Sequence, residues 1–338
     1  MIKLSFQTFA QLCEMLKGLY GVVSVADLRS IGGGFTTENF LFSDGEATYF
    51  LKRYNTTDTA RIHDIATAYE RFSQGGIPVI QPIKNTQGES CFFLDETWWG
   101  VFPFVDGITK TSTELTSHDV AELGNMLGKI HQVGQSCLLQ DIQPIPLWNK
   151  DVFTSEKRLL EYTYHHEIQK REIETLAIEN LTTKERFLSS HADFIASLHP
   201  LNNCLIHGDF IHNNVFFSPD GQIKATFDLD KACVAPRSYE VARSMFIICF
   251  DHGWDETNFT LADTFLRHYL AIHPMSFEEF QSGLYTYTAN FSHMTWVEKK
   301  VILYKDPRRD KHLRSSNMRI KHLAEEFPTL AERLFPHT

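Results

Sequence analysis

The first hundred residues alternate short apolar stretches with turn signals, a pattern typical of strands rather than of long helices. Apolar residues recur at helical spacing over 1–21 and again over 58–73, which predicts one amphipathic helix at each place. Residues 23–55 indicate strands interrupted by the glycines at 32–34, and two further apolar stretches, SCFFLD and WWGVFPFV, follow the second helix. We therefore expect a small antiparallel sheet with one helix across it.

From Thr116 onward the periodicity changes to that of long helices, over 117–133, about 148–199, 236–250 and several stretches after 257. Asp106-Gly107 is a turn signal directly after an apolar strand, so it is the predicted connection between the two parts. A chain of 338 residues also exceeds the size at which one core usually stops growing. The pattern predicts an α+β fold with two lobes, a strand-rich one over 1–105 and a helix-rich one over 106–338.

Charge and composition narrow the range of partners. Acidic residues outnumber basic ones by 42 to 32, and a net charge of −10 disfavours nucleic acid or an anionic membrane as a partner. The stretch MFIICF at 245–250 is far shorter than the roughly 20 residues that a membrane span needs. The six cysteines are scattered without a C-x-x-C pair, which predicts reduced thiols and a cytoplasmic protein.

The segment LIHGDFIHNNVFFSPDGQIKATFDLD places three polar side chains in apolar surroundings. Asp209 and Asn214 have the D-x-x-x-x-N spacing of a kinase catalytic loop, in which the Asp accepts the proton of the attacking hydroxyl and the Asn holds magnesium. Asp228 ends the strand IKATF, where a kinase places its second metal ligand. Any one of these residues could instead be a turn former or a helix cap. Their common order predicts a Mg²⁺–ATP site with Asp209 as the base and Asn214 and Asp228 as metal ligands.

Residues upstream of this segment would serve the nucleotide. Lys52 lies on the strand TYFLKRY after the glycine-rich turn IGGGFTTEN, the order in which kinases place the phosphate-covering loop and the phosphate-binding lysine. Gly33 and Gly34 are therefore the expected glycines of that loop, and Glu70 on the next helix is the expected partner of Lys52. A flexible hairpin, a surface lysine and a solvated glutamate are the alternative interpretations.

Together these pieces resemble the aminoglycoside phosphotransferase and choline kinase superfamily. The matching stretches span most of the chain: GGGFTTENF, FLKRY, AYERF with GIPVIQPI, GVFPFVDG, LGNMLGKIHQ, HGDFIHNNVFF and FDLDKACVAPRSYEVAR. The resemblance implies a bilobal protein-kinase-like fold, ATP and Mg²⁺ as cofactors, and a small-molecule acceptor with a hydroxyl group. It also implies adenine binding by the carbonyl of Pro103, since proline lacks only the N–H donor, and by the N–H of Val105. Alternatively, FPF marks a strand edge.

Several positions refine this resemblance. Ile211 stands where aminoglycoside-modifying members often carry histidine, and with the helical insert before the catalytic loop the chain looks closest to the homoserine-kinase-like branch. Glu240 takes the place of an acid that braces the catalytic loop in the family. Only seven residues separate Asp228 from Pro236, so a peptide-docking activation segment is missing and a protein substrate is not expected.

The negative net charge favours an acceptor that carries an amino group. Asp255 in FDHGWDETN and Glu298 in HMTWVEKK lie among acids and tryptophans, which attract ammonium groups, so both are candidate substrate-binding residues. Asp230 is a third candidate. Alternatively, its only role is to hold its own loop in place. A nucleotide-binding or scaffold protein without turnover is the alternative function, and GTP is an alternative to ATP.

Overall fold

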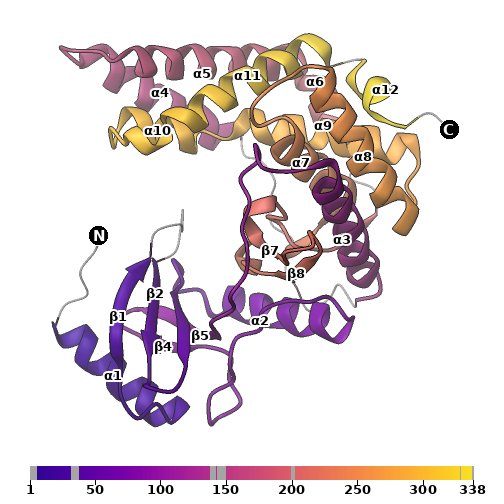
Figure 1. Ribbon diagram of the computed structural model, residues 1–338. Helices are drawn as coiled ribbons and strands as arrows, with labels where there is room; N and C mark the ends of the chain where they lie inside the picture. The colour runs from indigo at the N-terminus through magenta and orange to yellow at the C-terminus, as the bar shows by residue number, and fades with distance from the viewer. Residues whose placement is uncertain are drawn as a thin grey trace.

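The computed structural model describes residues 6–31, 38–137, 142, 150–198, 202–327 and 329–336. The predicted glycine loop, with Gly33 and Gly34, lies outside the described residues. Figure 1 shows a smaller lobe that contains the main sheet and a larger, helical lobe. The predicted α+β architecture with two lobes is confirmed.

The sheet of the smaller lobe has five antiparallel strands in the order β1-β2-β3-β5-β4. Lys52 is on the central strand β3, where it lies opposite Asn39 of β2 and Gly100 of β5. A position between two partner strands fixes the backbone of Lys52 on both sides. The strands are β1 (Ala26–Ile31), β2 (Glu38–Ser43), β3 (Thr48–Arg53), β4 (Phe92–Leu94) and β5 (Thr97–Pro103).

Two helices pack on this sheet. Helix α1 (Phe6–Tyr20) buries Leu12 and Leu16 in a cluster with Phe42 and Trp99 of the strands. Helix α2 (Thr59–Gln74) begins where the Asp58 side chain accepts hydrogen bonds from two backbone N–H groups of its first turn. The predicted helix over 58–73 is therefore found with its boundaries shifted by one residue.

The helical lobe is organised around α3 (Ser117–Gln135), which packs along α8 (Glu256–Ile272). A Cβ at Gly124 of α3 would lie 2.4 Å from the carbonyl oxygen of Phe265 in α8, so this close approach requires glycine. The other helices are α4 (Lys150–His166), α5 (Glu172–Ser190), α6 (Ala192–Ala196), α7 (Arg237–Cys249), α9 (Phe277–His293), α10 (Trp296–Ile302), α11 (Asp310–Glu326) and α12 (Leu330–Leu334).

Two short two-stranded antiparallel sheets carry the predicted catalytic segment. One pairs β6 (Asn203–Ile206) with β9 (Cys233–Pro236), and the other pairs β7 (Val215–Phe217) with β8 (Ile223–Thr226). The largest apolar core joins residues of α2 to these strands and to α3 and α7. The predicted catalytic segment is thus anchored in the core that α2, α3 and α7 share.

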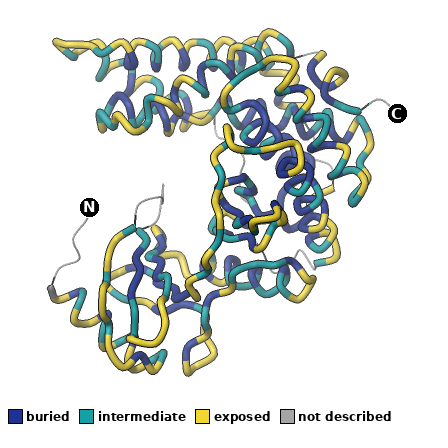
Figure 2. The backbone as a smooth tube through the Cα atoms, in the orientation of Figure 1, coloured by how far each residue is buried: buried dark blue, intermediate teal, exposed yellow. Residues whose placement is uncertain are grey.

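Figure 2 shows buried residues concentrated around α3, α7 and the short strands, whereas the outer side of the α4–α5 hairpin is largely exposed. The sheet ends at Pro103 and α3 begins at Ser117, so the boundary proposed near residue 105 falls in the connecting segment. All six cysteines are free thiols. Among the described helices, none combines the length and the apolar character that a membrane crossing requires.

Candidate active site

Asp209 lies in the loop after β6, and Gly208 gives this loop its path. Gly208 has a φ of +79°, and a Cβ there would lie 1.9 Å from the carbonyl oxygen of Lys231, so no other residue fits. The His207 ring fixes the loop: Nδ1 accepts the N–H of Asp209 at 3.3 Å, and Nε2 donates to the carbonyl oxygen of Phe227 at 3.0 Å. Burial lowers the pKa of His207 despite the acids nearby, so the ring is neutral, as these two bonds require.

Asn214 and Asp228 converge on the same loop. The Asn214 side-chain Nδ2 donates to the carbonyl oxygen of Asp209 at 2.8 Å, and its main-chain oxygen accepts the N–H of Phe227 at 3.0 Å. Asp228 follows directly, with a φ of 66° in the left-handed region, which Asp tolerates better than most residues. The structure therefore brings together Asp209, Asn214 and Asp228, which the sequence separates.

Lys52 reaches this centre from the sheet. Its Nζ lies 2.6 Å from Oδ1 of Asp228 and 2.6 Å from Oδ1 of Asp230, and only 6% of its side chain is exposed. Burial opposes the charge on Lys52, but the two carboxylates outweigh it and raise the lysine pKa. Burial raises the pKa of Asp230, and Lys52 opposes this effect. The charge of Asp228, which shares the same ammonium group, raises the pKa of Asp230 further. Asp230 thus lies on the lysine side of the centre and ties down its loop.

Asp209 is held by two cations that the sequence reasoning missed. Lys231 Nζ donates to its Oδ2 at 2.7 Å, and Nη2 of Arg243 donates to its Oδ1. Burial alone would raise the pKa of Asp209, but Arg243 and Lys231 lower it far below its ordinary value. Arg243 lies three residues after Glu240 on α7, so a basic residue on the same helix face was the signal available in the sequence.

Glu240 braces the loop, as the sequence suggested. Its fully buried carboxylate accepts hydrogen bonds from Nε2 of His131 at 2.9 Å and from the N–H of His207 at 3.0 Å. A longer contact of 3.5 Å joins it to the N–H of Phe210. Burial raises the pKa of Glu240, but the bond from His131 and the nearby positive charge lower it overall, so the group is ionised. Both backbone donors flank Asp209.

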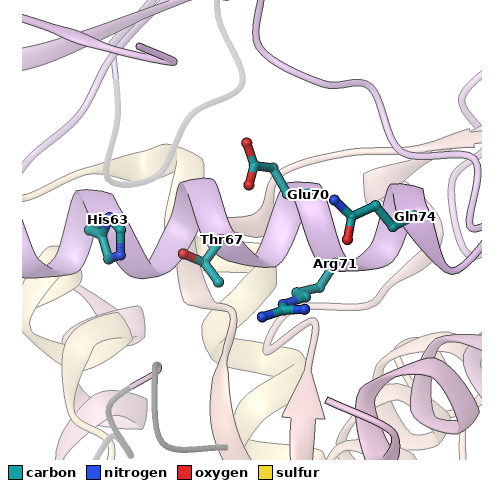
Figure 3. A pocket seen from close by; sticks show the side chains of 5 residues that line it. All are labelled: His63, Thr67, Glu70, Arg71 and Gln74. Carbon is teal, nitrogen blue, oxygen red and sulfur yellow. The ribbon is translucent and has the colours of Figure 1, made fainter. Parts of the chain in front are cut away.

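The structure does not pair Glu70 with Lys52. Tyr69 and Phe72 turn their side of α2 towards the core, and this leaves Glu70 half-buried on another side, where it forms an ion pair with Lys84 at 2.6 Å. Glu70 is one of the residues of α2 that line a pocket of about 460 Å³, shown in Figure 3. The other four described lining residues are not among the predicted site residues: His63, Thr67, Arg71 and Gln74.

Pro103 and Val105 lie where the sheet leads into the connecting segment. Pro103 ends β5, and the N–H of Phe104 donates to the carbonyl oxygen of Thr48 on β3 at 3.3 Å. Because backbone polar groups of successive strand residues point to opposite sides, the carbonyl of Pro103, the last residue of β5, is directed away from β3. This direction is the one that a hinge contact with a base needs.

Asp255 and Glu298 do not form a common acceptor pocket. Asp255 is exposed and caps α8 through hydrogen bonds to two backbone N–H groups of its first turn. Glu298 is fully buried, and its Oε1 binds Lys184 Nζ at 2.7 Å and Asn180 Nδ2 at 2.7 Å. A carboxylate enclosed among α5, α10 and α11 and already paired with a lysine cannot receive a soluble ammonium group. The predicted role of Glu298 is therefore wrong, and Asp255 serves as a helix cap.

Comparison with known proteins gives a family and a fold. A family model described as "Phosphotransferase enzyme family" matches residues 27–279. The chain is 21% identical over 261 residues to a homoserine kinase of Polaromonas naphthalenivorans (strain CJ2), and the match covers 75% of each chain.

Solved structures of two kinases align over nearly the whole chain. A spectinomycin phosphotransferase in complex with ADP and spectinomycin has a TM-score of 0.68 at 17% identity and covers 96% of this chain and 98% of its own. An amicoumacin kinase in complex with AMP-PNP and Ca²⁺ has a TM-score of 0.68 at 13% identity and covers 99% of this chain and 96% of its own. The fold expected from the resemblance is therefore confirmed.

Proposed function

Because the chain belongs to the phosphotransferase enzyme family, we propose that it transfers the γ-phosphoryl group of ATP to a hydroxyl of a small molecule. The observation that carries this proposal is the convergence of Asp209, Asn214, Asp228 and Lys52, from three separate segments, on one centre. Phosphoryl transfer depends mainly on positioning and on neutralising charge, and these four side chains provide a base, oxygen ligands and a cation.

Asp209 would orient the acceptor hydroxyl and take its proton. Its depressed pKa keeps it ionised at neutral pH, which a proton acceptor requires. Lys231, with 53% of its side chain exposed, can move away to admit the hydroxyl, whereas Arg243, with 12% exposed, is held in place. One oxygen of Asp209 thus becomes available while the other stays fixed.

Asn214 and Asp228 would hold Mg²⁺. The amide nitrogen of Asn214 is already bound to the Asp209 carbonyl, so the free atom of this side chain is the oxygen, and Asp228 adds a carboxylate. Oxygen donors of this kind fit a hard divalent ion. When bound, the ion neutralises charge on the nucleotide phosphates.

Lys52, Pro103 and Val105 would bind the nucleotide, with Gly33 and Gly34 over the phosphates. Lys52 is buried and charged, and it can exchange a carboxylate for a phosphate oxygen without losing an ionic partner. The carbonyl of Pro103 points away from β3 at the end of the sheet, which supports adenine binding here, with the N–H of Val105 as the proposed second contact.

The acceptor is proposed to be a small hydroxyl compound, in keeping with the homoserine kinase and the two antibiotic kinases to which the chain is similar. Release of ADP from Mg²⁺–ATP should be measured with homoserine, threonine, choline, ethanolamine, methylthioribose, small aminoalcohols, simple sugars and spectinomycin. We expect at least one acceptor to stimulate ADP release well above the acceptor-free rate.

Asp209→Asn is the matched control for this panel. It should lower kcat by about 10²- to 10⁴-fold, the usual contribution of a positioned base, and leave ATP binding nearly intact. Wild-type turnover in this variant would remove Asp209 from its proposed role. Binding of Mg²⁺–ATP without turnover on any acceptor would instead favour a nucleotide-binding protein without activity.

A further inference from the structure

Arg243 lies close enough to Asp209 to contact an acceptor molecule that binds there. Its Nη2 donates to Oδ1 of Asp209, but its Nη1 is buried and makes no hydrogen bond with any described residue. A guanidinium group has five N–H donors in a planar fork, and leaving such donors unmet in a buried place is costly. The unmet donors of Arg243 therefore mark a place where an acceptor atom is missing.

The position of Arg243 separates it from the nucleotide side. Lys231 belongs to the segment of Asp228 and Asp230, the residues that face Lys52, and it binds the other oxygen of Asp209. Arg243 comes from α7, inside the helical lobe, and lies beside Tyr239, whose hydroxyl oxygen accepts from Asn290 at 2.8 Å. Of the two cations on Asp209, Arg243 is thus the one that does not belong to the segment facing Lys52.

A second guanidinium group follows behind it. The rings of Tyr239 and Tyr287 are 6.5 Å apart, and the Tyr287 hydroxyl accepts from Nη1 of Arg319 at 3.3 Å. Arg319 is buried on α11, and its Nε makes no hydrogen bond within the described residues. Each of these two neighbouring tyrosines therefore has an arginine with an unmet N–H donor beside it.

The acids of this region already have cationic or hydroxyl partners. Asp251 binds Ser315 at 2.9 Å and lies 3.7 Å from Nη2 of Arg319. Glu240 is used by the catalytic loop, and Glu298 is paired with Lys184. The group left for an acceptor on this side of Asp209 is therefore the unmet N–H donor of Arg243, which suits an anionic acceptor group better than the cationic one expected from the sequence.

From this arrangement we infer that the acceptor carries an anionic group, and that it is a small hydroxy acid whose carboxylate binds Arg243. The inference rests on the proposed kinase function and names the substrate class of the same site. A planar carboxylate matches the fork of a guanidinium group. Because Asp209 and Arg243 are hydrogen-bonded to each other, the hydroxyl and the carboxylate of the acceptor must be only a few carbon atoms apart.

The test compares acceptors that differ only by the carboxylate. The pairs are homoserine and 3-aminopropan-1-ol, threonine and 1-aminopropan-2-ol, and 4-hydroxybutyrate and propan-1-ol. Wild-type enzyme should favour the acid of the accepted pair by about 10²-fold in kcat/KM, and Arg243→Met should remove this preference by raising the KM for the acid, since truncating a buried charged partner has an effect of this size. Arg243→Lys should retain part of the preference, because it keeps the charge and loses the fork.

Lys231→Gln is the matched control, since it removes the other cation from Asp209 without removing the proposed anion-binding group. It should change kcat for both members of a pair alike and leave the preference intact. Equal use of both members by the wild type, or an equal loss for both in Arg243→Met, would overturn the inference and assign Arg243 to Asp209 or to the phosphoryl group.

Calorimetric binding of the same acids separates this inference from the proposed function. Acid binding that is lost in Arg243→Met, in an enzyme that turns over no acceptor, would retain the anion site and reject the kinase. Turnover of neutral or cationic acceptors only, with no acid bound, would retain the kinase and reject the anion site.

Discussion

Replacing Glu240 by Gln tests whether the catalytic loop depends on its brace. The variant keeps the shape of the side chain and removes its charge. An amide can keep its oxygen at the position of Oε2, where it still accepts from His131 at 2.9 Å and from the His207 N–H at 3.0 Å. The amide nitrogen then faces the N–H of Phe210, which is the longest and weakest of the three contacts at 3.5 Å.

The expected loss of stability follows from this geometry. Two charge-assisted hydrogen bonds become neutral ones, each weaker by about 1 kcal/mol, so the free energy of unfolding should fall by about 2 kcal/mol. The catalytic effect should be larger in proportion. His207 and Phe210 flank Asp209, and a small displacement of a positioned group can reduce turnover by about 10- to 100-fold. KM for ATP should change little, because Glu240 bonds to His131, His207 and Phe210 and not to Lys52 or to the segment after β5.

The assay is urea unfolding combined with steady-state kinetics, with Glu279→Gln as the control. Glu279 is also buried, and it receives two bonds from Arg237, at 2.6 and 2.8 Å, away from the catalytic loop. The control should lose as much stability or more and keep its kcat. If both variants lose the same fraction of kcat, general destabilisation explains the effect and the brace does not.

Three further predictions concern single groups of the same centre. Asp228→Ala should abolish turnover and remove the Mg²⁺ dependence of ATP affinity in titrations with and without the ion, and an unchanged dependence would move the metal elsewhere. Burial lowers the pKa of His212 from about 6.5 to about 4, so this ring contributes about 3 kcal/mol of stability above pH 6.5 that is lost as the pH falls to 4. In His212→Gln the free energy of unfolding should fall by about 3 kcal/mol less between pH 6.5 and pH 4, and an unchanged pH dependence would contradict this. Gly208→Ala should lower the free energy of unfolding by at least about 2 kcal/mol and abolish activity, since φ is +79° and the Cβ would strike a carbonyl oxygen; near-normal stability would contradict the loop path.

Local signals predicted most of the elements correctly. The apolar spacing over 58–73 predicted α2 to within one residue at each end, and the D-x-x-x-x-N spacing predicted that Asp209 and Asn214 lie together because both belong to one short loop. The predicted pairing of Glu70 with Lys52 was wrong because it took account of the helix that carries Glu70 but not of the direction of its side chain. Consecutive helix residues are rotated by roughly 100°, so a Tyr69 that faces the core carries Glu70 away from the site.

Long-range pairing could not be predicted in the same way. Lys184 and Glu298 are 114 positions apart in the sequence, and the periodicity of one helix cannot predict a counter-ion that comes from another. Arg243 is an intermediate case: its spacing from Glu240 put it on the face towards the loop, but only the packing of α7 against β6 shows that it meets Asp209. Charges near a site are therefore poor guides to substrate charge until their partners are known.

The carboxylates that the sequence places in apolar surroundings are tolerated because each has a cation. Asp209 is matched by Arg243 and Lys231, and Asp228 and Asp230 share Lys52, so three acids meet three bases. An unpaired buried charge would be far more costly than the pair. Under the proposed mechanism, Asp228 would help to hold Mg²⁺, and Lys52 would pair with a phosphate oxygen in place of this carboxylate. Acceptor binding does the same on the other side, where an anionic acceptor can bind Arg243 while its hydroxyl replaces Lys231 at Asp209. A cationic acceptor would place a further positive charge beside Arg243, and this is the physical reason to test the acids first.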